Sequence, residues 1–214
     1  MSIKAVIFDL DGVIVSTDKY HYQAWKKMAD EEEIYFDKII NEGLRGVSRM
    51  ESLEIILKKS QKIYNQNEKE ELAGRKNNYY REMLNCLTPT DILPGVIKVL
   101  EFLRERGIKI AIGSSSKNTP FILEKIGLGS YFDAVSDGND INKSKPDPEV
   151  FLLAAKKIRV IPGECLVLED ADAGIEAALA GGMKVMGVGF AAKNVKANYR
   201  AHDLLNFKFD ELLK

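Results

Sequence analysis

Two pairs of acidic residues stand directly after apolar segments of the chain. Asp9 and Asp11 follow the first such segment, and Glu169 and Asp170 follow a later one. Neighbouring carboxylates repel one another unless a cation or a shared proton lies between them, and Mg²⁺ prefers oxygen ligands of this kind. A solvated acidic turn would also explain the first pair, and a helix cap would explain Asp170 but not its pairing with Glu169. The four carboxylates predict a metal-assisted phosphate site if the two segments meet.

A group of smaller polar residues follows a third apolar segment. Ser114, Ser115, Ser116, Lys117 and Asn118 lie between this segment and a helical pattern. Hydroxyl and backbone N–H groups at the start of a helix can bind phosphate oxygens. A helix cap rich in Ser and Asn accounts for the same residues equally well. The segment is therefore a candidate phosphate-binding loop.

Lys145 lies between a serine and the sequence Pro-Asp-Pro, which predicts a rigid loop ahead of a helix. An ammonium group there could neutralise an aspartate and a phosphate together. The alternative is an ordinary solvent-exposed lysine, the usual place for this residue type.

The elements that must position these residues alternate along the chain. Short apolar runs bounded by glycine or acidic residues predict buried parallel strands at 3–8, 108–113, 134–135, 165–168 and 184–188. Segments of helical period lie between them at 96–106, 120–126, 148–157 and 174–180. Alternating strands and helices indicate an α/β fold with a doubly wound parallel sheet, whose ligands bind at the carboxyl ends of the strands.

Residues 17–87 interrupt this alternation because they show helix signals and no strand pattern. Ser48 with Glu51 forms a capping-box pattern, and Asn67 with Glu70 offers a second helix start. We therefore expect an all-helical cap at 17–87, inserted into an α/β core made of 1–16 and 88–214. Polar breaks at 15–17 and 88–90 would serve as its hinges.

The composition excludes several classes of protein. Lys and Arg number 31 against 32 Asp and Glu, a net charge of -1, so no overall field favours nucleic acid or an anionic membrane. Cys86 and Cys165 are the only cysteines, too few for a disulfide framework. The apolar N-terminus carries Lys4 and Asp9, which argues against a signal or membrane-spanning segment. We expect a cytoplasmic monomer that binds a small molecule.

Together the motifs resemble the haloacid dehalogenase superfamily over essentially the whole chain. The resemblance rests on Asp-Leu-Asp-Gly-Val from Asp9, on Ser114, on Lys145 and on the Glu169–Asp170 pair, in that order. The chain is more similar still to the beta-phosphoglucomutases. The short sequences that this chain shares with them are Gly-Val-Ser-Arg at 46–49, Arg-Lys-Asn at 75–77, Ser-Lys-Asn at 116–118 and Lys-Pro-Asp-Pro at 145–148.

This resemblance implies a role for each catalytic position. Asp9 would be the nucleophile that becomes an aspartyl phosphate, and Asp11 the general acid and base. Ser114 and Lys145 would spread charge over the transferring oxygens. The implied ligands of Mg²⁺ are Asp9, Asp11 through its backbone carbonyl, Glu169 and Asp170.

The resemblance also implies a substrate-binding set that reaches into the cap. Arg49 would grip the non-reacting phosphate, and Lys76 and His21 would help to position Asp11 when the cap closes. For Trp25 we favour packing in the cap core. The full implied set is Thr17, His21, Trp25, Gly46, Arg49, Ser52, Lys76, Ser115, Ser116, Lys117 and Asn118.

The activity implied by the resemblance is the interconversion of beta-glucose 1-phosphate and glucose 6-phosphate. It would depend on Mg²⁺ and pass through a bound glucose 1,6-bisphosphate. One alternative is a sugar-phosphate phosphatase that uses the same residues but lets water take the phosphoryl group. Another is a binding domain that keeps the fold without turnover, although such a domain would be expected to lose the motif acids.

Overall fold

The computed structural model describes residues 2–207 and 209–211. Its centre is a six-stranded parallel sheet in the order β3-β2-β1-β4-β5-β6, which confirms the predicted doubly wound α/β fold. The strands are β1 (Ala5–Phe8), β2 (Lys109–Gly113), β3 (Ala134–Ser136), β4 (Cys165–Glu169), β5 (Lys184–Val188) and β6 (Tyr199–Ala201). The chain runs outward from β1 and then returns to place β4 on its other side. The switch point of the sheet, where such folds bind ligands, is therefore between β1 and β4.

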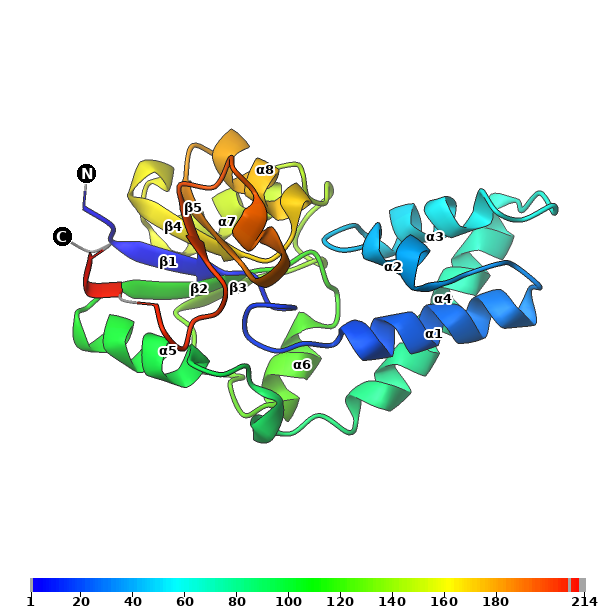
Figure 1. Cartoon of the computed structure of the whole chain (residues 1–214), viewed down its shortest axis with the longest axis horizontal. Coiled ribbons are helices and arrows are strands. Elements are labelled where there is room, and N and C mark those ends of the chain that lie inside the picture. The colour runs from blue at the N-terminus through cyan, green and yellow to red at the C-terminus, as the bar shows by residue number, and fades with distance from the viewer. Residues whose placement is uncertain (1, 208, 212–214) are drawn as a thin grey trace.

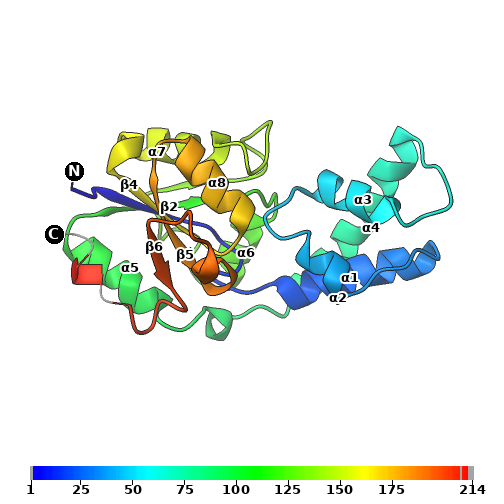
Figure 2. The same ribbon diagram turned by 45° about the horizontal axis from the view of Figure 1, so that its top comes forward.

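Helices cover both faces of the sheet, as Figure 2 shows. Residues of β1 alternate between the two faces: Val6 and Phe8 pack in one apolar cluster, and Ala5 and Ile7 in another. The first cluster includes residues of α5 (Val96–Glu105) and α6 (Thr119–Lys125), and the second those of α7 (Glu149–Ile158) and α8 (Asp172–Ala180). Burial on both faces explains why the strands read as continuous apolar runs.

Residues 18–84 form a separate group of helices beside the carboxyl ends of the strands (Figure 1). These helices enclose an apolar cluster of their own, which includes Trp25, Met28 and Leu53. They are α1 (Asp18–Glu31), α2 (Lys38–Glu42), α3 (Arg49–Leu57) and α4 (Gln66–Leu84). The chain enters and leaves this group side by side, because the Leu93 N–H donates to the Ile14 carbonyl at 2.8 Å.

Helix starts in this group are set by side-chain caps. The predicted capping box of Ser48 and Glu51 is confirmed at the start of α3. The predicted second start was wrong by two residues, because Asn65 with Glu68 caps α4 in place of Asn67 with Glu70. Both pairs have the same spacing, and the pair two residues earlier forms the reciprocal hydrogen bonds.

Short elements complete the fold. The 3-10 helices are η1 (Pro89–Asp91), η2 (Pro162–Glu164), η3 (Gly189–Lys193) and η4 (Phe209–Glu211). Strand β6 was not predicted, because its three residues, with Arg200 exposed at the centre, form no apolar run. No helix within 2–207 and 209–211 combines the length and apolar character needed to cross a membrane.

Candidate active site

The two predicted acidic segments meet at the switch point of the sheet. Asp9 follows β1, Glu169 ends β4, and the two strands are paired from Ala5 with Cys165 onward. Oxygens of Asp9, Glu169 and Asp170 all lie within 4.8 Å of one another, and all three residues are buried. Asp170 does not cap α8, whose N-cap is Ala171 with no side-chain hydrogen bond. The simple capping interpretation of Asp170 is therefore wrong.

Lys145 supplies the positive charge inside this acidic group. Its Nζ donates to Asp9 Oδ1 at 2.5 Å and to Glu169 Oε2 at 2.8 Å, and its side chain is only 1% exposed. The solvent-exposed alternative for Lys145 is therefore wrong. Burial alone would lower the pKa of this ammonium, but the carboxylates of Asp9 and Glu169 raise it above its ordinary value. Lys145 is thus a permanent cation beside Asp9.

Two glycines, which have no Cβ, make room for the carboxylates of the acidic group. A Cβ on Gly12, whose φ is +78°, would lie 2.1 Å from Asp170 Oδ2, and a Cβ on Gly174 would lie 2.0 Å from Glu169 Oε2. Burial first, and then neighbouring acidic charge, raises the pKa of both Glu169 and Asp170. Lys145 contacts two of the three buried carboxylates and does not contact Asp170, so this oxygen-lined cradle fits a hard divalent cation such as Mg²⁺.

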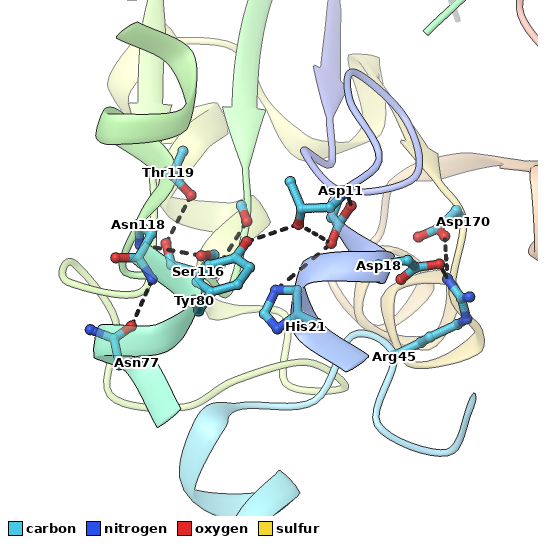
Figure 3. A network of polar contacts seen from close by, with 12 residues as sticks. Asp11, Asp18, His21, Arg45, Asn77, Tyr80, Ser116, Asn118, Thr119 and Asp170 are labelled. Atoms are coloured by element: carbon cyan, nitrogen blue, oxygen red, sulfur yellow. Dashed lines mark hydrogen bonds and ion pairs between the residues drawn. The ribbon is translucent and has the colours of Figure 1, made fainter. Parts of the chain in front are cut away.

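Asp11 lies apart from this group and faces the cap helices (Figure 3). Its carboxylate accepts hydrogen bonds from the Thr17 backbone N–H at 2.6 Å and from Thr17 Oγ1 at 2.7 Å. Burial, with the charge of Asp18, raises the pKa of Asp11 to about 7, although the Thr17 hydrogen bonds oppose this shift. A carboxyl group with a pKa near 7 can both give and take a proton at neutral pH.

The cap side of the site holds a basic pair. Lys76 Nζ lies 2.9 Å from His21 Nδ1 and 4.7 Å from the centre of the Trp25 ring. Burial lowers the pKa of both Lys76 and His21, and nearby cations, among them Arg49, lower each further. His21 Nε2 is 3.9 Å from Asp11 Oδ2, but a neutral imidazole makes this a polar contact rather than an ion pair. Trp25 is 2% exposed and packs in the cap core, as favoured from the sequence.

The serine-rich loop after β2 turns back on itself. Ser114 Oγ accepts from the Ser116 N–H, and Ser116 Oγ accepts from the Asn118 N–H, each at 3.2 Å. The Ser115 hydroxyl is buried with no partner among the described residues. Asn118 Nδ2 donates to Asn77 Oδ1 on α4 at 3.0 Å, so this loop also contacts the cap helices (Figure 3). The unpaired Ser115 hydroxyl makes this loop suited to an anion.

A cavity of about 540 Å³ joins these parts between the helical group and the sheet. Most predicted site residues line it. They are Asp9, Asp11, His21, Trp25, Gly46, Arg49, Ser52, Lys76, Ser114, Ser115, Ser116, Lys117, Asn118, Lys145 and Asp170. Thr17 and Glu169 do not line it; each is buried behind a residue that does, Asp11 and Lys145 respectively.

Several polar residues that line this cavity were not among the predicted site residues, and Asp18, Arg45 and Asn77 are three of them. Arg45 and Asn77 adjoin predicted positions, Gly46 and Lys76, so proximity in the sequence was the available signal. Asp18 directly follows Thr17 in the same way.

Comparison with known proteins agrees with this geometry. The sequence model of a family described as haloacid dehalogenase-like hydrolase matches residues 3–182. A protein from Bacillus subtilis named beta-phosphoglucomutase is 47% identical over 87% of this chain and 84% of its own length. A Thermotoga maritima protein named phosphorylated carbohydrates phosphatase is 29% identical over 99% of this chain and 97% of its own. A crystal structure of beta-phosphoglucomutase from Clostridium difficile superposes with a TM-score of 0.92 and 41% identity, over 98% of this chain and 95% of that one. With three buried acids and a buried lysine meeting at the switch point of its sheet, the chain belongs to the haloacid dehalogenase-like hydrolase family.

Proposed function

We propose that this protein is a Mg²⁺-dependent phosphomutase that interconverts beta-D-glucose 1-phosphate and D-glucose 6-phosphate through glucose 1,6-bisphosphate. The observation that carries the proposal is the separation of two carboxyl groups. Asp9 lies within the acidic group beside Lys145, whereas Asp11 is held by Thr17 and faces the cap. One group is placed to attack phosphorus and the other to move a proton. The 47% identity to a beta-phosphoglucomutase supports the same assignment.

In the proposed reaction an Asp9 carboxylate oxygen forms a bond to phosphorus as the bond from phosphorus to the sugar oxygen breaks. Protonated Asp11 gives its proton to that sugar oxygen, and ionised Asp11 later takes the proton of the attacking sugar hydroxyl. The Lys145 ammonium, already beside Asp9, neutralises part of the charge on the transferring oxygens. Asp9, Glu169 and Asp170, with the Asp11 backbone carbonyl, would hold Mg²⁺, which supplies further positive charge at the phosphoryl group.

The mutase outcome requires that sugar, and not water, attacks the aspartyl phosphate. In this proposal residues 17–87 act as the cap, and Arg49 with Ser116, Lys117 and Asn118 binds the phosphate that does not react. These groups line one cavity together with Asp9. Binding of that phosphate would favour closure and exclude water while the sugar is present. Action as a cytoplasmic monomer stays a prediction.

The alternative is a sugar-phosphate phosphatase, which the relative from Thermotoga maritima named as such favours. The decisive assay supplies Mg²⁺, beta-glucose 1-phosphate and a trace of glucose 1,6-bisphosphate, and follows glucose 6-phosphate and free phosphate together. We expect glucose 6-phosphate to dominate. Dominant free phosphate would establish the phosphatase instead.

Substitution of Asp9 tests whether it is the nucleophile, for a mutase and a phosphatase alike. Asp9→Asn should lose turnover by several orders of magnitude, because no carboxylate oxygen remains to form the acyl phosphate. Mass spectrometry of acid-quenched protein should detect a phosphate adduct on the wild type and none on the variant. An adduct of unchanged amount on Asp9→Asn would contradict the assignment. The matched control is Asp137→Asn, a second buried aspartate that does not line the cavity.

A further inference from the structure

Arg45 joins the cap helices to the core at the edge of the site. It lies in the loop between α2 and α3, and its guanidinium forms an ion pair with Asp18 at the start of α1. The same group lies 3.8 Å from Asp170 Oδ2 and 3.8 Å from the centre of the Phe190 ring, both in the core (Figure 3 shows Arg45 between Asp18 and Asp170). Arg45 is thus shared between the two parts of the molecule.

The loop that carries Arg45 is packed tightly on the core at the same place. A Cβ added to Gly46 would lie 3.1 Å from the Cβ of Ala171, the residue next to Asp170. Arg45 Nε is buried without a hydrogen-bond partner among the described residues, and the guanidinium stacks on the Phe190 ring. Phe190 is still 56% exposed, and stacking of a guanidinium on such a ring contributes most where water is partly excluded.

We propose that Arg45 is a positioning residue that holds the cap loop on the core through Asp170 and Phe190, and that it competes electrostatically with a divalent cation for Asp170. The competition with a cation rests on the metal site of the proposed function, whereas the positioning of the cap loop does not.

The competition follows from the charges around Asp170. Asp9, Glu169 and Asp170 are balanced by Lys145 from one side and by Arg45 from the other. A divalent cation among the three carboxylates removes most of the negative potential that attracts Arg45. By linkage, Arg45 must weaken cation binding to the same extent that the cation weakens the contact of Arg45 with Asp170.

Arg75 offers a matched control within the cap. Its guanidinium pairs with Glu31 at 3.0 Å and with Glu32 at 2.6 Å, and all three residues belong to the helical group. Arg75→Gln therefore removes a paired cap arginine without touching the core. Arg45→Gln removes one whose contacts cross to the core.

Calorimetric titration of the substrate-free protein with Mg²⁺ tests the competition. We expect Arg45→Gln to bind Mg²⁺ about 5-fold more tightly than wild type, at the lower end of typical couplings between sites. Arg45→Lys, which keeps the charge, should restore wild-type affinity, and Arg75→Gln should not change it. Equal or weaker affinity of Arg45→Gln would overturn the competition. If wild type itself bound no Mg²⁺, the proposed metal site and the competition would both fail, and the next experiment would still decide the cap contact.

Hydrogen exchange in EDTA tests the cap contact without metal or substrate. Amides of residues 43–48 should exchange at least several-fold faster in Arg45→Gln and in Phe190→Leu than in wild type, because either change removes part of the contact with the core. In Arg75→Gln these amides should exchange as in wild type. Unchanged exchange in both Arg45→Gln and Phe190→Leu would overturn the proposed positioning role.

Discussion

At the scale of single residues, Lys145 stabilises the buried acidic group of Asp9, Glu169 and Asp170. Its ammonium contacts two carboxylates, and its side chain is only 1% exposed. Removing one partner of a buried ionic group leaves charge that neither water nor a counterion stabilises, which typically costs about 3–5 kcal/mol. Without Mg²⁺, Lys145→Met should therefore lower the free energy of unfolding by roughly this amount, measured by urea denaturation in EDTA.

A surface lysine provides the comparison for this prediction. Lys196 pairs with Glu176 at 2.6 Å, but both side chains are about half exposed. Exposed pairs contribute little to stability because water screens them, so Lys196→Met should lower the free energy of unfolding far less than Lys145→Met. Equal losses in Lys145→Met and Lys196→Met would show that burial of the lysine adds nothing.

Sequence alone could identify the types of residue in the site but not their surroundings. Asp9 and Glu169 could be placed because each ends an apolar strand, and parallel strands end at one edge of a sheet. Lys145 was found from its motif, yet the sequence around it fits an exposed loop just as well. Its burial depends on contacts 136 and 24 residues away, with Asp9 and Glu169, which no local pattern encodes.

At the scale of elements, a glycine near the start of α8 leaves room for one carboxylate of the acidic group. Gly174 lies in the first turn of α8, where alanine would ordinarily stabilise a helix by about 0.5–1 kcal/mol. Here the added Cβ would lie 2.0 Å from the Glu169 carboxylate, which is buried and cannot move into solvent. Gly174→Ala should therefore destabilise the protein by about 1–3 kcal/mol, the usual cost of overpacking, and should weaken Mg²⁺ binding.

Gly74 is the matched control for this change. It lies within α4, and a Cβ there would meet nothing within 4 Å. Gly74→Ala should stabilise the protein by about 0.5–1 kcal/mol, so the two substitutions should have opposite signs in thermal or urea unfolding. Stabilisation by both substitutions would mean that the Glu169 carboxylate can move aside. It would contradict the claim that the missing Cβ of Gly174 is needed to make room for this carboxylate.

The elements themselves were predictable to different degrees, for physical reasons. Strands β1, β4 and β5 are buried on both faces, so their apolar runs mark them clearly. The start of α4 was displaced because Asn65 and Asn67 both have a glutamate three residues later. Which of the two asparagines caps the helix depends on how the chain before it is placed in the folded protein, and the local sequence does not show this.

For the whole molecule, the buried carboxyl groups of Asp11 and Asp170 make stability depend on pH. Burial raises the pKa of Asp11 to about 7 and that of Asp170 to about 9, against ordinary values of 3.8. A carboxyl group with a raised folded pKa contributes stability that is complete below its unfolded pKa and is lost as pH rises through its folded pKa. In the metal-free protein the stability contributed by these two carboxyl groups should therefore fall between about pH 4 and about pH 9, whereas His21 and Lys76, whose pKa values are lowered, contribute in the opposite direction.

Mg²⁺ should reverse the part of this loss that comes from Asp170, because it would bind the ionised carboxylate that high pH creates. A ligand at about 100 times its Kd stabilises the folded state by about 2.7 kcal/mol, which for a chain of this size raises Tm by roughly 5–10 °C. The difference in Tm between Mg²⁺ and EDTA should thus be small near pH 5 and reach this size near pH 8, measured by differential scanning calorimetry. The pH dependence separates binding at the acidic group from general salt effects, since screening of surface charge has no reason to grow as these buried groups ionise. A difference that is the same at both pH values would place the cation elsewhere on the molecule and leave Lys145 and Arg45 as the cations beside three buried carboxylates.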